Sequence, residues 1–583
     1  MAICAGYAAQ VVRAASWADT QQLNAIFPYY HWRVRLMPGA SWLEFKSMLA
    51  LINGLSISGV CALLFWKAAR SRNAGWPKFT AGLQVWRNAW WDLKLIERRT
   101  ALSVLLVLTG LRLVQSLPAV TPAYDDAPSY SLFVSRGILA ATSYYPVPNN
   151  HVLSSVVDWL FFQVNPGFWW TMRLPVILAA TFATILLFWG LLREGTAFRP
   201  ALLAVLLFSF SQLSQYHAAV GRGYWLLTLA AGVVFFSTLA LTRATGRTSR
   251  AAWLGLLGGG IVGAYAVPTF ALLLWSAFAW IGWHYARRFD AGGLLRLLLA
   301  GLVIGSAALL LYSPLLEVSG FDKLFSNGFV VAQPWPQYLR GLPGYLWQAE
   351  GFLAGQMKVG AVLTLLVLLG TGWYRRLGSV PAHLETGGRQ LIPVSLWFML
   401  APYAELVAQR VYAPERTLFY KSFFFFLLAA LLVEVLLHKN TWPRLTRTAL
   451  WLMLLGWTSY QFNSLARDNR APRLRNANYH AAYEWLAGRT PAPTLVPEPA
   501  QAIFLRLYFS SESPGRRWQP DAEPQPGQAY TYVVAFPNRR GYFQPLMQSA
   551  PVFQNPDVAI YQLPAATPQP SRPAWWHLAD SSH

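Results

Sequence analysis

Residues 223–242, GYWLLTLAAGVVFFSTLALT, contain no charged side chain. Such a stretch can cross a bilayer as a helix, because about 20 apolar residues span the hydrocarbon core. Similar stretches recur at about 47–66, 101–118, 170–190, 201–215, 251–265, 268–285, 293–312, 357–374, 391–408, 419–437 and 447–462. We therefore expect a mainly α-helical, polytopic membrane protein with about 11 to 13 spans. The pair 251–265 and 268–285 fits either two short helices or one broken helix, since Pro268 lies between them.

The composition excludes several other classes of protein. The chain is 55% hydrophobic and 15% aromatic, which excludes an intrinsically disordered chain, and its 12% of charged residues is half of what soluble proteins carry. The net charge of +23 is spread over short loops, with no basic stripe between stacking aromatics, so we expect no nucleic-acid partner. The two cysteines, Cys4 and Cys61, cannot build a disulfide framework or a cysteine-rich zinc site.

The loops between the spans fall into two classes of charge. The loops 67–100, 191–200, 243–250, 286–292, 375–390 and 438–446 hold 20 Lys and Arg residues, and the loops 119–169, 216–222, 313–356 and 409–418 hold six. Cytoplasmic loops are enriched in Lys and Arg, so the second class is expected on the side away from the cytoplasm. For a bacterial protein this predicts the inner membrane, with residues 1–100 forming an extension of one span and a basic cytoplasmic loop.

The tail 463–583 follows the last span on the outer side. It contains two strand-like runs, 528–536 and 558–563, and a short helical pattern over 477–486. We expect a small extracytoplasmic α/β domain with disordered ends.

Two adjacent carboxylates, Asp125 and Asp126, open the first long outer loop. Neighbouring like charges can leave one carboxyl group with a raised pKa, which suits a general acid or base. The alternative is structural, because Asp is also a common helix N-cap. The spacing by itself does not decide between the two.

A helix predicted to begin near Asn150 follows in the same loop. It would carry one polar side and one apolar side, and would therefore lie in the membrane interface. His151, at its start, either faces a phosphate or hydroxyl group or is merely solvated on the polar side. That polar side is formed by His151, Ser154, Ser155 and Asp158, and the apolar side by Val152, Val156, Trp159, Leu160 and Val164.

Two arginines, Arg222 and Arg416, stand at the outer ends of spans. A guanidinium group suits the oxygens of a phosphate, which it can bind with two parallel hydrogen bonds. The alternative is that each side chain extends to the membrane surface, as arginines at span ends often do.

Together these motifs resemble the GT-C glycosyltransferases, in the branch that includes protein O-mannosyltransferases, lipid A aminoarabinose transferase and rhizobial lipopolysaccharide glycosyltransferases. The resemblance covers roughly 101–440, with 101–462 as the catalytic membrane domain. It departs in having Asp126 where many relatives have Glu, and residues 1–100 fit no pattern of the family. The matching motifs are Asp125-Asp126, residues 148–153 (PNNHVL), 222–224 (RGY), 312–314 (YSP) and 414–416 (PER).

The resemblance implies an inverting transfer of a sugar from a polyprenyl-phosphate donor, within the membrane lipids, to an envelope lipid, glycan or protein. Asp125 would be the general base and Asp126 would assist it. No metal ligand is assigned, although some relatives use a divalent metal. The donor phosphate would be bound by Arg222 and Arg416 with His151 and Lys421, and the substrates by Tyr124, Asn149, Asn150, Tyr216, His217, Tyr224 and Glu415.

Two other functions remain open at this point. A transporter or flippase of lipid-linked glycans would favour charged residues deep within spans and an internal repeat. A polymerase or ligase of lipid-linked glycans would use the same donor chemistry without the early acid pair. A non-enzymatic scaffold would leave Asp125, Asp126, Arg222 and Arg416 without a role.

Overall fold

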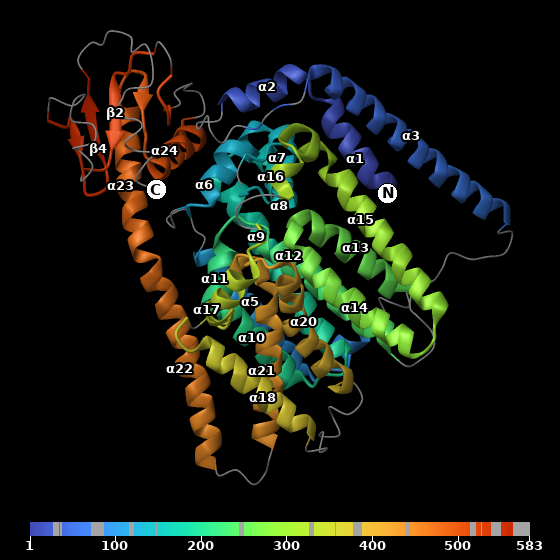
Figure 1. Cartoon of the computed structure of the whole chain (residues 1–583). Helices are drawn as coiled ribbons and strands as arrows, with labels where there is room; N and C mark the ends of the chain where they lie inside the picture. The colour runs from blue at the N-terminus through green and yellow to red at the C-terminus, as the bar shows by residue number, and fades with distance from the viewer. Residues whose placement is uncertain are drawn as a thin grey trace.

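The protein is a bundle of helices with a small sheet-containing domain at one end (Figure 1). This description rests on a computed structural model. It describes residues 1–26, 34, 36, 38–70, 87–115, 122–146, 148–243, 250–325, 331–355, 357–376, 388–438, 444–513, 520–525, 528–537 and 550–563. Most of the loop 375–390 and the end of the tail, which we predicted to be disordered, lie outside these residues.

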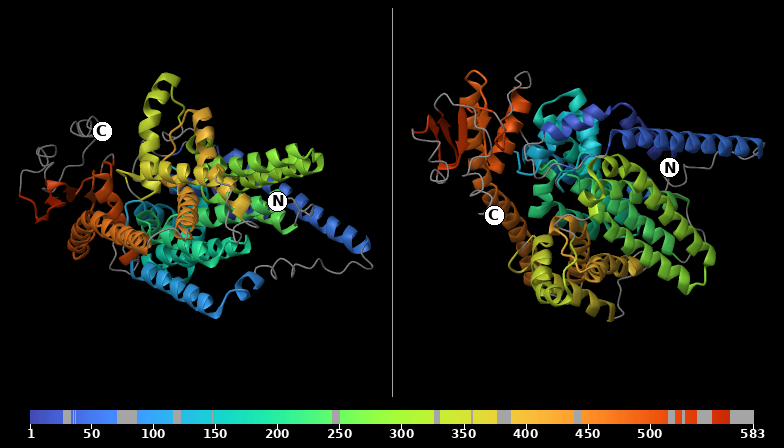
Figure 2. Two further views of the ribbon diagram at one scale, coloured as in Figure 1. Left: turned by 90° about the horizontal axis from the view of Figure 1, so that it is seen from below. Right: turned by 45° about the horizontal axis from the view of Figure 1, so that its top comes forward.

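The N-terminal region is dominated by the long helix α3, which contains the predicted span 47–66. α3 packs on α1, and α1 packs on α15. Beyond these contacts α3 leaves the bundle, as all three views show (Figures 1 and 2), and only 11% of its most apolar window is buried. The helices of this region are α1 (Ala2–Arg13), α2 (Trp17–Ile26), α3 (Gly39–Arg70) and α5 (Leu95–Gln115).

The central bundle places a helix at every predicted span. Pro268 separates α13 from α14 with a short 3₁₀ turn, so this pair is two helices. The elements from the first outer loop onward are α6 (Asp126–Pro128), η2 (Ser129–Phe133), η3 (Val134–Arg136), α7 (Ile138–Ser143), α8 (Val152–Val164), η4 (Trp169–Arg173), α9 (Leu174–Arg193), α10 (Phe198–Phe210), α11 (Gln212–Ala219), α12 (Tyr224–Thr242), α13 (Arg250–Ala266), η5 (Pro268–Phe270), α14 (Ala271–Arg287), α15 (Ala291–Ser319), α16 (Phe321–Phe325), α17 (Trp335–Leu353), α18 (Gly360–Arg376), α20 (Gly388–Gln409), η6 (Glu415–Leu418), α21 (Tyr420–His438) and α22 (Arg444–Asp468).

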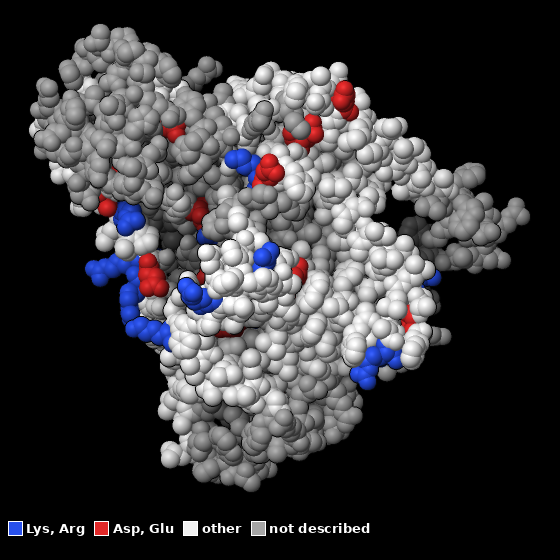
Figure 3. Space-filling view, in the orientation of Figure 1, with Lys and Arg blue, Asp and Glu red and all other residues white. Residues whose placement is uncertain are grey.

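Among the described residues, five helices are long and apolar enough to cross a membrane. Together with the composition they make the chain an integral membrane protein. The visible face of the bundle is accordingly largely free of charge (Figure 3). The total of about 11 to 13 spans stays a prediction. The five candidate spans are Gly39–Ala62, Trp169–Arg193, Tyr224–Thr242, Ala291–Ser319 and Gln390–Gln409.

The predicted span 201–215 is not one continuous helix. α10 ends at Phe210, Ser211 is extended, and α11 begins at Gln212. The Ser211 hydroxyl accepts a hydrogen bond from the Ser214 N–H at 3.3 Å, which is the contact of an N-cap. This cap breaks the helix where hydrophobicity alone predicted continuity.

The polar side of helix α8 faces inward, contrary to the prediction of a solvated face. Ser154, Ser155 and Asp158 are buried, whereas Leu160 and Val164 are 53% and 75% exposed. The reason is that buried hydroxyl groups need partners and lipid-facing positions favour apolar side chains. The Ser155 hydroxyl donates to Asn150 Oδ1 at 2.7 Å, which fixes the start of the helix.

The C-terminal domain combines a helical hairpin with a four-stranded sheet. Its strand order is β1-β2-β4-β3, with β1 parallel to β2 and the other pairs antiparallel. The elements α23, β2 and β4 lie at the three segments predicted from the tail. Its core is continuous with the first outer loop, since Phe504 and Tyr508 share one cluster with Tyr130 and Phe133. The elements are α23 (Arg470–Ala487), β1 (Thr494–Leu495), α24 (Pro499–Glu512), β2 (Tyr532–Ala535), β3 (Phe553–Gln554) and β4 (Ala559–Gln562).

α6, α7 and the C-terminal domain lie at one end of the bundle, and the end of α21 and the start of α22 lie at the other (Figure 1). The first outer loop thus lies next to the C-terminal domain, with which it shares a core. The side of the membrane on which this end lies stays a prediction.

Candidate functional site

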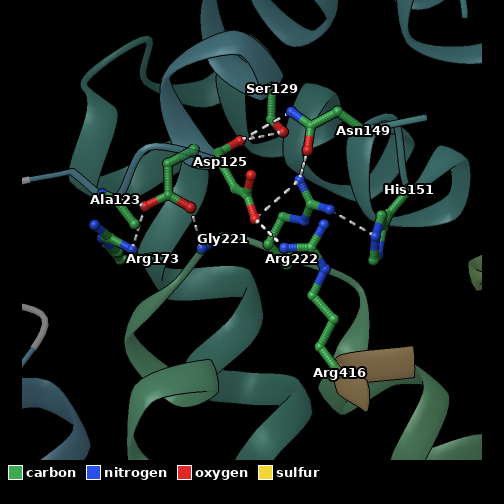
Figure 4. Close-up of polar contacts among 10 residues, drawn as sticks. Ala123, Asp125, Ser129, Asn149, His151, Arg173, Gly221, Arg222 and Arg416 are labelled. Carbon is green, nitrogen blue, oxygen red and sulfur yellow. Dashed lines mark hydrogen bonds and ion pairs between the residues drawn. The ribbon is translucent and has the colours of Figure 1, made fainter. Parts of the chain in front are cut away.

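The carboxylates of Asp125 and Asp126 have different partners. Figure 4 shows Asp125 beside Arg222 and Arg416. Asp126 is fully buried: its Oδ2 lies 2.7 Å from Arg173 Nη1, and its Oδ1 accepts the Gly221 N–H at 2.8 Å. Oδ2 also accepts the Ala123 N–H at 3.1 Å. Burial raises the pKa of Asp126, and Arg173 opposes this shift. Asp126 therefore connects the first outer loop to the segments around 173 and 221.

Gly221 is suited to this connection because it has no side chain. A Cβ atom at this position would lie 2.8 Å from the carbonyl oxygen of Met172. The loop before α12 can therefore approach the start of α9 closely, and its N–H reaches Asp126.

Asp125 is 27% exposed and faces two guanidinium groups. Its Oδ2 lies 3.4 Å from Arg416 Nη1 and 3.9 Å from Arg222 Nη1. The Asp125 side chain makes no capping hydrogen bond to α6, so the N-cap alternative does not describe it. Three segments far apart in the sequence thus meet at one carboxylate: the start of α6, the loop before α12, and η6.

Arg222 is held from its other side by the first outer loop. Its Nη1 donates to Asn149 Oδ1, its Nη2 lies 2.9 Å from His151 Nε2, and only 2% of its side chain is exposed. Burial lowers the pKa of His151 well below its ordinary value, so the ring is neutral and Nε2 can accept from the guanidinium. Arg222 does not extend to the membrane surface.

These charged groups line a cavity of about 700 Å³. Such a volume is typical of small-molecule sites. Seven of the predicted site residues form part of its wall. They are Asp125, Tyr216, His217, Arg222, Tyr224, Glu415 and Arg416.

His217 is buried in this wall between aromatic rings, and neither ring nitrogen has a hydrogen-bond partner among the described residues. Its ring centroid lies 4.3 Å from that of Tyr224 and 5.1 Å from that of Phe419. Burial lowers the pKa of His217 to about 3 and raises the pKa of Tyr216 to about 12. Both side chains are therefore neutral at pH 7 and can bind a ligand only as hydrogen-bonding or stacking groups.

Six other predicted residues lie elsewhere. Asn149 and His151 contact Arg222, and Asp126 pairs with Arg173, as described above. Asn150 donates to the Ala141 carbonyl oxygen at 2.9 Å, and the Lys421 ammonium lies 2.8 Å from Glu350 Oε1. Tyr124 is 51% exposed and lines a neighbouring, smaller cavity.

Sequence reasoning missed two charged residues that support the site, Arg173 and Glu350. Arg173 stands inside the apolar run 170–190, and Glu350 neutralises the buried Lys421. The available signal was the charge itself, because an ionisable residue within an apolar stretch needs a partner.

Among the described residues, no group of three or more His, Cys, Asp and Glu side chains is close enough to hold a metal ion. The Asp125 carboxylate, which a metal would need, already faces two cations. We therefore assign no role to a metal.

The fold is similar to that of ArnT from Cupriavidus metallidurans bound to undecaprenyl phosphate, with a TM-score of 0.50 and 13% identity over 81% of this chain and 99% of that one. The apo state of ArnT gives a TM-score of 0.41 and 12% identity, over 81% and 100% of the two chains. Arabinosyltransferase EmbB from Mycobacterium smegmatis gives 0.41 and 16%, over 68% and 34%. No protein-family model and no curated protein matches the sequence. The likeness to ArnT shows the fold, and it confirms the predicted polytopic helical bundle.

Proposed function

We propose that this chain is a glycosyltransferase that moves a sugar from a polyprenyl-phosphate-linked donor to an acceptor of the cell envelope. The observation that carries the proposal is the carboxylate of Asp125, which faces Arg222 and Arg416 in a cavity of about 700 Å³. The bound undecaprenyl phosphate in the ArnT structure, which shares this fold, supports a polyprenyl phosphate as the donor's lipid part.

The two arginines are suited to the departing phosphate. Cations that are already in place where negative charge develops stabilise a transition state strongly when water is excluded. Arg222 is buried and fixed by Asn149 and His151, so its guanidinium does not need to reorganise. With donor bound, the phosphate oxygens take the place beside the arginines that Asp125 Oδ2 has here.

Asp125 is suited to the role of general base. Within the part of the chain that the structure describes, its Oδ1 has no hydrogen-bond partner, so this oxygen is free to accept the proton of an acceptor hydroxyl. The acceptor oxygen then forms a bond to the anomeric carbon as the bond from that carbon to the phosphate oxygen breaks. The electron pair leaves with the polyprenyl phosphate, and one displacement inverts the anomeric centre.

The site is proposed to face away from the cytoplasm of a bacterial inner membrane. The support is the distribution of 20 basic residues in one class of loops against six in the class that contains Asp125, Arg222 and Arg416. The C-terminal domain lies at the same end as α6, so it would be extracytoplasmic too.

The proposal is tested by comparing envelope lipids and glycans of cells with and without the protein by mass spectrometry. We expect one sugar to be missing from one class of envelope molecule, and expression of the Asp125→Asn protein not to restore it. Purified protein should transfer the same sugar from its polyprenyl-phosphate form. Envelopes of identical composition, or full restoration by Asp125→Asn, would contradict the proposal.

A further inference from the structure

A second cavity, of about 730 Å³, lies between the C-terminal domain and the start of α9. One side of its wall is formed by η4, which contributes Trp169 and Trp170. The opposite side is formed by α23 and α24, with His480 and Glu512. No residue of the proposed catalytic cavity lines it, and no step of the proposed reaction uses it.

The wall of this interdomain cavity combines flat aromatic faces with unused hydrogen-bonding groups. The indole Nε1–H groups of Trp169 and Trp170 are buried and have no acceptor among the described residues. The indole N–H groups of Trp42, Trp253 and Trp280 also have no acceptor among the described residues, so this property alone does not mark a site. Trp169 and Trp170 in addition line this cavity, where a ligand with oxygen acceptors would pair their donors. Both tryptophans stand on a π-helical turn, a rare conformation that is frequent at functional sites.

The opposite wall offers acceptors. His480 Nε2 lies 3.1 Å from both carboxylate oxygens of Glu512, and His480 Nδ1 lies 3.5 Å from Glu484 Oε1. This arrangement holds the two carboxylates near each other, with lone pairs left for the hydroxyl groups of a ligand. A phosphate head group would be repelled by these carboxylates, and a lipid tail would leave the indole donors unpaired. A sugar satisfies both walls, because its hydroxyls donate and accept while its ring face stacks on an aromatic side chain.

A third cavity, of about 220 Å³, which we call the connecting cavity, adjoins both larger ones. It shares Arg173 and Asn476 with the interdomain cavity, and Tyr216 and Val220 with the cavity that contains Asp125. The exposed Arg473 and Arg475 also line it, and Figure 3 shows basic residues gathered where α22 passes into α23. The three cavities thus lie next to one another between the C-terminal domain and Asp125, with shared side chains in the walls between them.

We infer that the interdomain cavity binds the oligosaccharide part of the acceptor, and that the connecting cavity leads its reactive hydroxyl to Asp125. The second half of this inference rests on the proposed glycosyltransferase function, whereas the first half requires only binding. The C-terminal domain accordingly takes part in recognising the acceptor.

The test uses the purified full chain and, as probe, the oligosaccharides released from the host envelope by mild acid. Saturation-transfer NMR measures binding without any turnover. We expect wild type and Asp125→Asn to bind the probe equally. The double variant Trp169→Phe, Trp170→Phe keeps the rings and removes the two donors, and each lost hydrogen bond should weaken binding by roughly 3- to 10-fold. Trp283→Phe, at a 60% exposed position on α14, is the matched control and should bind normally.

A second variant tests the connection. Ala500 lines the connecting cavity from α24, and Ala500→Trp should obstruct it. We expect this variant to bind the oligosaccharide as wild type does, and to transfer sugar at least about tenfold more slowly, as displacement of a reacting group implies.

The outcomes separate this inference from the proposed function. Absence of oligosaccharide binding by wild type, or unchanged binding by the double tryptophan variant, would overturn the inference. So would displacement of the probe from the cavity by vesicles of anionic phospholipid. Normal transfer by Ala500→Trp would overturn the proposed route. If wild type binds the oligosaccharide at the tryptophans but transfers no sugar, the binding site stands and the proposed function fails.

Discussion

The carboxylate of Asp125 and the guanidinium of Arg416 lie 3.4 Å apart although 291 positions separate them in the chain. Arg222 joins them from a third segment, so no local pattern produces this arrangement. The helical bundle holds the three segments in place, and the chemistry of the cavity depends on their relative positions.

Asp125→Asn should abolish turnover while the protein stays folded. The amide cannot accept a proton at neutral pH, and general-base catalysis typically contributes roughly 10²–10⁴-fold. The measurement is the rate of sugar transfer by purified variants with matched melting temperatures. Asp322→Asn, at an exposed position on α16, is the control and should transfer normally. Near-normal transfer by Asp125→Asn would return this residue to a structural role and reopen the transporter alternative.

Replacing the arginines should weaken donor binding. A charge-assisted hydrogen bond contributes about 1.5–3 kcal/mol, so Arg416→Met should raise the KM for the donor by roughly 10- to 150-fold. Arg222→Lys should also be impaired, because one ammonium group cannot reach both Asn149 and His151 as the guanidinium does. The control is Arg340→Met, at an exposed position of α17. A KM for Arg416→Met equal to that of wild type would exclude phosphate binding by this residue.

The main effect of Asp126→Asn should be on the stability of the folded protein rather than on the reaction itself. It leaves the buried Arg173 guanidinium without its carboxylate, and breaking a buried ion pair typically costs about 3–5 kcal/mol. We expect a marked fall in melting temperature. Adding Arg173→Met should restore part of it, because an apolar pair needs no charge compensation. An Asp126→Asn protein as stable as wild type would show that this pair does not hold the loop.

Stability should fall in mild acid because His217 is buried as a neutral ring. Its folded pKa, about 3, is below the unfolded value of roughly 6.5, so its contribution is present above about pH 6.5 and is lost as the pH falls toward 3. Between pH 7.5 and 5 the loss is about 2 kcal/mol. His217→Phe keeps the aromatic contacts and cannot be protonated. The melting temperature of this variant should therefore fall less than that of wild type between pH 7.5 and 5, and equal falls would contradict the assignment.

The orientation can be tested by cysteine labelling. In a background of Cys4→Ser and Cys61→Ala, we expect Gln337→Cys to react with an impermeant thiol reagent in intact cells, and Ser379→Cys to react only after permeabilisation. The reason is the excess of basic residues in the loop class of 375–390. The reverse pattern of labelling would move Asp125 to the cytoplasmic side.

The sequence predicted the helices well, because each apolar run is a local property. It failed at Ser211, where one side-chain cap breaks a hydrophobic run, and at α8, where the pattern showed two faces but not which one lies inside. An amphipathic pattern shows that a helix has two different faces, but which face lies inside depends on what packs around the helix. Here the polar side of α8 packs against protein together with Val152 and Val156, so the assignment of the polar side to water was wrong.

The site itself was predicted in part. Asp125, Arg222 and Arg416 were chosen because charges at span ends are costly without a partner, and the structure places them together. The residue pattern alone did not separate the roles of Asp125 and Asp126, which only the resemblance to the family distinguished. The structure shows the different surroundings, because Arg173 and the Gly221 N–H bind the second carboxylate. Only the tertiary structure separates the two carboxylates, and their adjacent positions in the sequence give no sign of it.

The meeting of Asp125 with Arg416 also sets an order of events during biosynthesis. Asp125, Asp126 and Arg222 are synthesised early, whereas η6, which contains Arg416, is synthesised only after α20. A nascent chain arrested before that point lacks Arg416, the second cation of the proposed phosphate site, and the proposed reaction has to await insertion of the late helices. A truncation allele ending after α18 should therefore produce a membrane-embedded but catalytically silent polypeptide.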